Sequence, residues 1–108
     1  MKKRILVLLK SKQWNYVGNS YNCTSIALDT EDYRYVVTVN DLSYTPAVRV
    51  VKILNETGKT YECFHISFSI LFSSLSRELF LKAYRKVNKV RKQHALAQQV
   101  GELAYATC

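Results

Sequence analysis

Residues 48–66 read VRVVKILNETGKTYECFHI, and this stretch decides the fold. Two runs rich in β-branched and aromatic residues, 48–54 and 60–66, flank the polar segment 55–59. That segment carries Gly58 near its end, which suits a type I turn followed by a residue in the left-handed conformation. The stretch therefore predicts an antiparallel hairpin with a tight, glycine-dependent turn.

Upstream of this hairpin, the sequence indicates further strands. Residues 5–9 (ILVLL) form a continuous apolar run between lysines, which is typical of a buried strand. Residues 24–28 and 33–39 are rich in β-forming residues and flank the polar segment 29–32, so we expect a second hairpin there. Residues 14–22 mix aromatic residues with glycine, asparagine and serine, and this composition favours a loop or an irregular edge.

The hydrophobic period changes after residue 66. From Ser76 onward apolar residues recur at helical spacing, with no proline and with Gly101 as the single breaker, so we predict a helix of about 25 residues. We expect one domain, 1–108, with strands and turns over 1–66 and mainly helix over 67–106. The predicted fold class is α+β: a bent antiparallel sheet or a small SH3-like barrel of about five strands, followed by one long C-terminal helix.

The predicted helix separates into an apolar face and a basic face at about 100° per residue. The apolar face contains Leu79, Phe80, Ala83, Val87, Val90 and Ala97, with Tyr84 at its edge. The opposite face carries the basic stripe, which consists of Lys82, Arg85, Lys86, Lys89 and Lys92. Residues 82–94 contain six Lys or Arg and no acid, so we expect no i,i+4 ion pair to neutralise the stripe.

The net charge of +8 favours an anionic partner, either nucleic acid, an acidic membrane surface or an acidic protein surface. The basic stripe has two leading interpretations, the solvated face of a packed helix and a set of phosphate contacts. Membrane binding is less favoured, because the apolar face lacks Trp and is needed to cover the sheet. A protein groove that accepts a basic helix is another minor alternative.

A second concentration of positive charge lies near the start of the chain. This N-terminal basic cluster consists of Lys2, Lys3, Arg4, Lys10 and Lys12. If the cluster adjoins the basic stripe, the combined surface is broad enough for a duplex or a structured RNA. Whether the two adjoin depends on the tertiary structure.

The number and spacing of the cysteines and the length of the apolar runs indicate the cellular compartment of the protein. Cys23, Cys63 and Cys108 are odd in number and not closely spaced, which is unlike a secreted disulfide framework. The N-terminal apolar run is too short for a signal peptide before Lys10 and Lys12 interrupt it. No run approaches the roughly 20 apolar residues of a membrane span. We therefore expect a cytoplasmic protein without a membrane span.

Catalytic and metal-binding patterns are weak in this sequence. Cys63 and His65 alternate on one predicted strand and can point to the same side, but no third group is placed to orient them for nucleophilic chemistry. Together with Cys23 and His94 they lack the close ligand spacing of zinc sites. A metal-free ribonuclease assembled in space stays open as a minor alternative. The sequence otherwise predicts no enzymatic activity, no metal and no cofactor.

Tyr33 and Tyr35 share one face of their predicted strand with Val37. Exposed aromatic rings beside Arg34 would offer a surface on which single-stranded bases can stack. The segment lacks the pattern of RNP-type sheets, so burial of the tyrosine rings in the core is the favoured interpretation.

We expect a non-enzymatic, low-specificity nucleic-acid-binding protein whose basic stripe contacts the phosphate backbone of DNA or RNA. The alternative is a small protein-binding inhibitor or accessory factor, for example a viral protein that blocks a host complex. An exposed apolar patch would favour this alternative, because protein interfaces depend on such anchors. The long helix is also a candidate surface for a homodimer.

Overall fold

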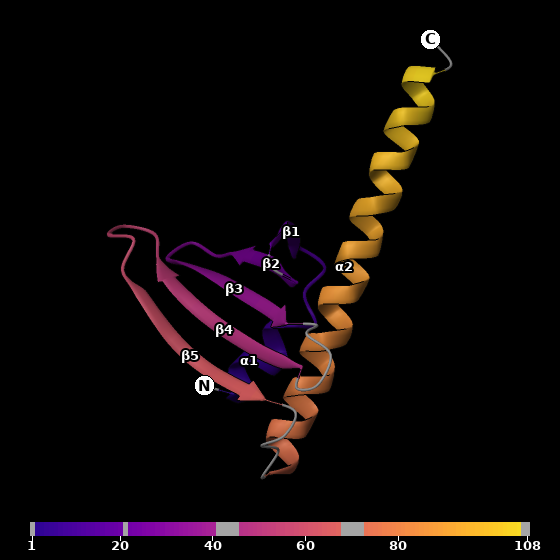
Figure 1. The fold of residues 1–108 in the computed structure, drawn as a ribbon. Helices are drawn as coiled ribbons and strands as arrows, with labels where there is room; N and C mark the ends of the chain where they lie inside the picture. Colours follow the sequence, from indigo (N-terminus) through magenta and orange to yellow (C-terminus); the bar gives the residue numbers. More distant parts are fainter. Residues whose placement is uncertain (1, 21, 41–45, 68–72, 107–108) are drawn as a thin grey trace.

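The computed structural model describes residues 2–20, 22–40, 46–67 and 73–106, with side chains described up to residue 100. It confirms the α+β class, with five antiparallel strands followed by one long C-terminal helix, and the sheet is open rather than closed into a barrel (Figure 1). The elements in chain order are α1 (Lys2–Leu8), β1 (Asn15–Ser20), β2 (Cys23–Asp29), β3 (Tyr33–Asn40), β4 (Ala47–Leu54), β5 (Thr60–Ser67) and α2 (Ser74–Ala106). The strand order is β1-β2-β3-β4-β5, so each strand pairs with its neighbours in sequence.

The β4–β5 hairpin has the predicted turn. Gly58 adopts a φ of 74°, the left-handed conformation that favours glycine. Its N–H donates to the carbonyl oxygen of Leu54 at 2.7 Å, and the N–H of Leu54 donates to Lys59 O at 2.9 Å. The β2–β3 hairpin is also confirmed, with the Thr30 hydroxyl donating to Tyr33 O at 2.9 Å across the turn.

The prediction of a strand at residues 5–9 is wrong, because this segment belongs largely to helix α1. The N–H of Leu9 donates to the carbonyl oxygen of Ile5 at 2.9 Å, and both side chains are buried, whereas Val7 between them is exposed. A strand buried on both faces would also bury Val7. A short run of apolar residues does not distinguish the two structures, and here the helical spacing of Ile5 and Leu9 decides the outcome.

The sheet still has five strands, because β1 forms within residues 14–22, the segment that we expected to be a loop or an irregular edge. β1 is an edge strand, and its register with β2 shifts between Tyr16 and Gly18, which marks a β-bulge or irregularity. The turn into β2 contains Asn22 with a φ of 62°. Most β1 side chains are exposed, so the strand depends on backbone pairing with β2 more than on an apolar pattern of its own.

Helix α2 contains 33 residues and begins two residues before the predicted start at Ser76. Ser73 caps it, because its Oγ accepts a hydrogen bond from the N–H of Ser76 at 3.1 Å. Both helices lie on the same face of the sheet, and the C-terminal part of α2 runs past the sheet (Figure 1).

The core lies between the helices and the face of the sheet that they cover. Tyr35, Val37 and Val39 of β3 are buried there, in the alternating pattern of a strand with one covered face. From α2 the core receives Leu79, Phe80, Ala83, Val87 and Val90, as predicted. Ala97, which belongs to the same predicted apolar face, is exposed.

Candidate nucleic-acid interface

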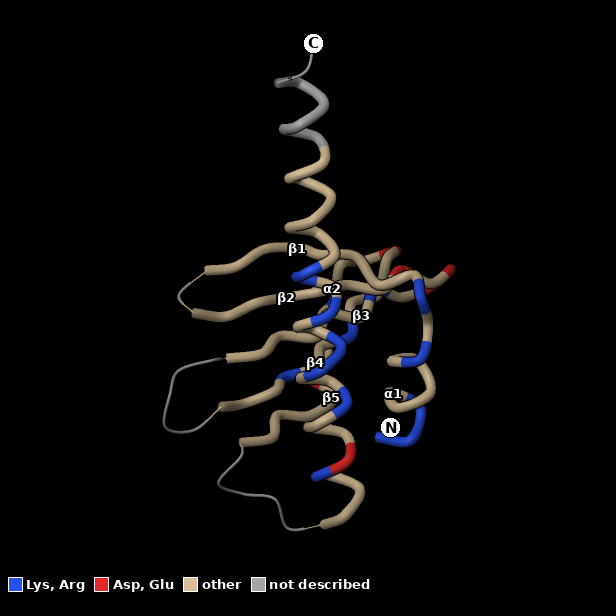
Figure 2. The backbone as a smooth tube through the Cα atoms, turned by 90° about the vertical axis from the view of Figure 1, so that its right-hand side faces the viewer, with Lys and Arg blue, Asp and Glu red and all other residues tan. Residues whose placement is uncertain are grey.

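The residues of the basic stripe recur along α2, next to the lysines and arginine of α1 (Figure 2). Lys86 is half-buried, whereas Lys82, Arg85, Lys89 and Lys92 are exposed. This arrangement follows from the position of the core, since packing Leu79, Ala83 and Val87 against the sheet turns the opposite face of the helix to solvent.

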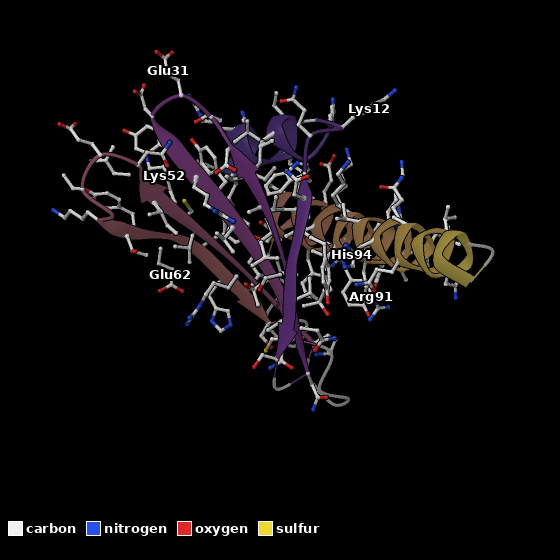
Figure 3. The ribbon with its side chains drawn as sticks, turned by 90° about the horizontal axis from the view of Figure 1, so that it is seen from above. Lys12, Glu31, Lys52, Glu62, Arg91 and His94 are labelled. Atoms are coloured by element: carbon white, nitrogen blue, oxygen red, sulfur yellow. The ribbon has the colours of Figure 1, made fainter. Side chains whose placement is uncertain are left out.

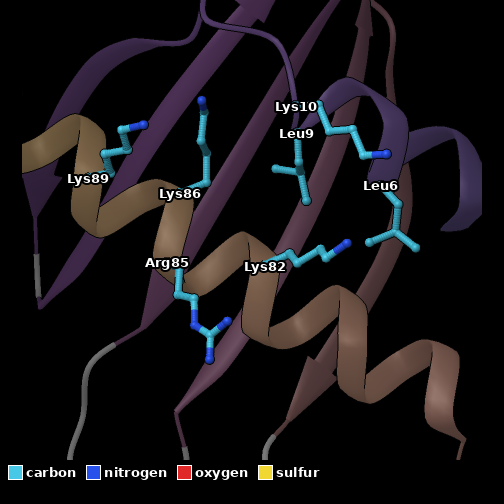
Figure 4. A pocket seen from close by; sticks show the side chains of 7 residues that line it. All are labelled: Leu6, Leu9, Lys10, Lys82, Arg85, Lys86 and Lys89. Atoms are coloured by element: carbon cyan, nitrogen blue, oxygen red, sulfur yellow. The ribbon is translucent and has the colours of Figure 1, made fainter.

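The N-terminal basic cluster adjoins this stripe, which the sequence alone left open. A groove of about 390 Å³ separates α1 and the turn after it from α2 (Figure 4). We call it the basic groove, and its lining consists of Leu6, Leu9, Lys10, Lys82, Arg85, Lys86 and Lys89. The cations come from both sides of the groove, and the leucines supply an apolar part of its wall.

Packing in the core holds Lys10 in this position. Ile5 and Leu9 are buried and attach α1 to the rest of the molecule. The indole N–H of Trp14 donates to the carbonyl oxygen of Leu8 at 2.8 Å, which fixes the chain as it leaves α1. Lys10 follows immediately after this anchored end. Sequence reasoning left the position of Lys10 relative to the stripe open, and its prediction of a strand over residues 5–9 did not place α1 beside α2.

One ion pair neutralises part of the stripe, and the expectation of none is wrong at this position. Lys82 Nζ lies 2.9 Å from Glu78 Oε1, an i,i+4 pair. Glu78 precedes the acid-free segment 82–94, so a count restricted to that segment does not include it. Within the described part of the chain, Lys10, Arg85, Lys86 and Lys89 make no ion pair with an acid. The unbalanced positive charge is therefore concentrated at these four residues.

Lys86 is the half-buried member of this group. Burial lowers the pKa of Lys86 below its ordinary value, and the nearby charges of Lys89 and Lys12 lower it further. The involvement of Lys12 places another member of the N-terminal basic cluster close to the stripe. An anion bound near Lys86 would reverse the effect of these like charges.

Lys92 belongs to the predicted stripe but does not line the basic groove. Near it, the ring of His94 stacks on Tyr16 of β1 with ring centroids 4.3 Å apart. This stack is a contact between the sheet edge and α2 close to the position where the helix leaves the sheet (Figure 3). Four of the five stripe residues thus share one concave site, and Lys92 stands apart.

The tyrosines of β3 lie in the core or pack against it. Tyr35 is 2% exposed and belongs to the core, as the favoured interpretation predicts. Tyr33 is half-buried, and Lys52 Nζ lies over its ring at 4.4 Å from the centroid. Both rings are thus already in contact with protein groups.

Cys63 and His65 do not share a side of β5. Cys63 packs against the core, whereas His65 is exposed and lines a hollow on the uncovered face of the sheet. The β4–β5 register shifts between Val50 and Val51, and this irregularity breaks the simple alternation on which the expectation depended. Burial raises the pKa of the Cys63 thiol, and Lys52 partly offsets this effect.

The described residues contain no group of three or more His, Cys, Asp or Glu side chains placed to hold a metal ion. Cys23 and Cys63 are free thiols, and Cys108 lies outside the described residues. Neither α1 nor α2, as far as each is described, has a stretch apolar enough to cross a lipid bilayer.

The uncovered face of the sheet carries a smaller hollow of about 200 Å³. Its lining is polar and includes Arg49, His65 and Asn40. Arg49 Nε lies 3.4 Å from Glu62 Oε1 on the neighbouring strand, so the charge of this arginine is already compensated. Among the described residues no acid compensates Lys86 or Lys89 in the basic groove, and this difference makes it the stronger candidate for an anion site.

Comparison of the chain with known protein families, with characterised proteins and with solved structures finds no significant match in any of the three.

Proposed function

We propose that this protein binds nucleic acid without catalysis, through phosphate contacts made by the basic groove and by Lys92 beside it. One observation carries the proposal: cations from two distant segments of the chain, Lys10 and residues 82–89, meet in one groove, and within the described residues only Lys82 is paired with an acid. Phosphates that replace bound counterions there would be held mainly by electrostatic attraction, so affinity falls steeply with salt. Contacts of this kind position a strand but carry little sequence information.

Two competing interpretations of the basic stripe fit these contacts less well. A merely solvated face gives no reason for a second set of cations to converge on the stripe, or for Lys86 to be half-buried among like charges. A helix lying on a membrane needs a free apolar face, yet Leu79, Phe80 and Val87 are already buried in the core.

The test is fluorescence anisotropy with labelled duplex DNA, single-stranded DNA and RNA across a salt series. The key variant is Lys86→Gln/Lys89→Gln. We expect wild type to bind each probe, and the variant to lose about 0.7 to 0.9 units of the log–log salt slope for each phosphate contact removed.

The matched control is Lys52→Gln/Lys59→Gln, which lowers the net charge by the same amount on the β4–β5 hairpin, away from α2 (Figure 3). We expect its salt slope to stay within about half a unit of wild type. Equal losses in the two variants would show that only net charge matters. Absence of binding by wild type at low salt would refute the proposal.

The second candidate function is protein binding by the C-terminal part of α2, where Leu96 and Val100 are 60% and 66% exposed. These side chains lie four residues apart and therefore share a helix face. Light scattering over a concentration series, with Leu96→Gln/Val100→Gln as the comparison, tests the homodimer form of this function. A dimer formed by wild type alone supports it, and a wild type that stays monomeric at every concentration refutes it.

A further inference from the structure

The basic groove is concave, and its shape restricts the kind of anion that fits it. Lys10 approaches from the end of α1, while Lys82, Lys86 and Lys89 approach from α2 on the other side (Figure 4). A phosphate that enters between them is contacted from two sides, unlike a phosphate that lies on a flat row of lysines. At about 390 Å³ the groove is within the range of small-ligand sites.

The charge distribution favours an anion that carries more than one charge. Lys86 is flanked by Lys89 and Lys12, and its pKa is lowered by burial and by these neighbours. Within the described residues, Glu78 pairs with Lys82 and does not line the groove, and Lys10, Lys86 and Lys89 make no ion pair with an acid. A phosphodiester in a strand brings one negative charge, whereas a terminal phosphate brings about 1.5 to 2 charges at pH 7 and three acceptor oxygens.

The apolar part of the wall adds a second requirement on the ligand. Leu6 and Leu9 line the groove beside the cations. An apolar wall lowers the local dielectric constant and strengthens the attraction between charges within the groove. It also offers a surface for the sugar and base that are attached to a terminal phosphate.

From these three features we infer that the basic groove binds the phosphorylated end of a nucleic-acid strand, with the terminal phosphomonoester between Lys10 and Lys86. This inference rests on the proposed function and adds an end preference to it. Lys92, outside the groove, contacts internal phosphates of the same strand and contributes no end preference.

The experiment compares three single-stranded DNA probes of one sequence, each with a fluorophore on an internal base. One probe has a 5′-phosphate, one has a 3′-phosphate, and one has hydroxyl groups at both ends. At about 150 mM salt, where distant charges are screened, we expect one of the end phosphates to raise affinity about tenfold over the hydroxyl probe. Tenfold corresponds to about 1.4 kcal/mol, close to the smallest usual contribution of a hydrogen bond to a charged group.

Two variants locate the preference. Lys10→Gln/Lys86→Gln is expected to bind all three probes with nearly equal affinity, while Lys92→Gln weakens all three by the same factor and keeps the preference. Circular dichroism confirms that each variant is folded. A nucleoside monophosphate that competes with the preferred probe, at a concentration where the free nucleoside does not, supports recognition of the phosphate group itself.

Equal affinity of wild type for all three probes would overturn the inference and leave the proposed function intact. Binding to none of them at low salt would refute the proposed function. An end preference that survives in Lys10→Gln/Lys86→Gln would also overturn the inference, because the end would then bind elsewhere.

Discussion

The two halves of α2 have similar apolar spacing but different surroundings. In residues 74–91, Leu79 and Val87 are 0% and 1% exposed because the sheet lies opposite them. In residues 92–106, Leu96 and Val100 are 60% and 66% exposed because the helix has passed the sheet. A helical apolar pattern thus indicates which side chains can be buried together, whereas the extent of the sheet decides which of them are buried.

The charges on α2 differ in the same way between the two halves. Lys86, in the covered half, is half-buried beside Lys89 and Lys12 and faces the basic groove. Lys92, where the projecting half begins, is exposed and outside the groove. Equivalent lysines of one predicted stripe therefore have different electrostatic environments, and the difference arises from α1 and the turn after it.

The largest expected effect comes from the same substitution made once in each half. Leu79→Ala removes a fully buried side chain and is expected to lower the free energy of unfolding by about 2 to 5 kcal/mol. Leu96→Ala, its matched control, is expected to change it by no more than about 0.5 kcal/mol. Urea denaturation of both variants measures the difference. Similar losses would mean that the projecting half is buried in solution, for example in a dimer.

A smaller effect is expected where the two halves meet. The stacked rings of Tyr16 and His94 join β1 to α2, so a double-mutant cycle with Tyr16→Leu and His94→Leu should give a coupling energy of about 0.5 to 1.5 kcal/mol. Denaturant melts of the two single variants and the double variant supply the four values. A coupling energy of zero would show that the rings do not interact in solution.

The smallest effect, and the one with the opposite sign, is expected for Lys86→Gln. The folded state lowers the pKa of Lys86, so the unfolded chain binds its proton more tightly. The charge of Lys86 therefore lowers the free energy of unfolding at neutral pH. This destabilisation disappears as the pH rises through the lowered pKa toward the ordinary lysine value. Lys86→Gln should raise the free energy of unfolding by up to about 0.5 kcal/mol at low salt and pH 7, whereas Lys92→Gln should leave it unchanged.

Thermal melts at pH 7 and pH 10 separate this effect from a general effect of net charge. The advantage of Lys86→Gln over wild type should shrink at the higher pH. If Lys92→Gln stabilised the protein as much as Lys86→Gln does, the stabilisation would come from the lower net charge and not from the environment of Lys86.

The sequence predicts the parts of the fold that depend on local chemistry. The β4–β5 turn needs a left-handed residue and has Gly58 there, and the strand pattern of 33–39 matches β3 because one face of that strand is covered. The N-terminal segment is less predictable, because a five-residue apolar run suits a strand and a short helix equally well. β1 has no clear pattern at all, since it forms by pairing its backbone with β2.

The sequence likewise predicts one part of the candidate site, the basic stripe, but not the other, the basic groove. The basic stripe follows from helical periodicity, and its residues are exposed except for the half-buried Lys86, as expected for a face opposite the core. The basic groove does not follow from periodicity, because Lys10 is separated from Lys82 by the whole sheet in sequence. By itself the sequence determined the hairpins, the long helix and the charge on its outer face, because these depend on neighbouring residues. Only the tertiary structure decided that α1 is a helix, that it lies beside α2 and that two sets of cations meet, because these depend on packing between segments far apart in the chain.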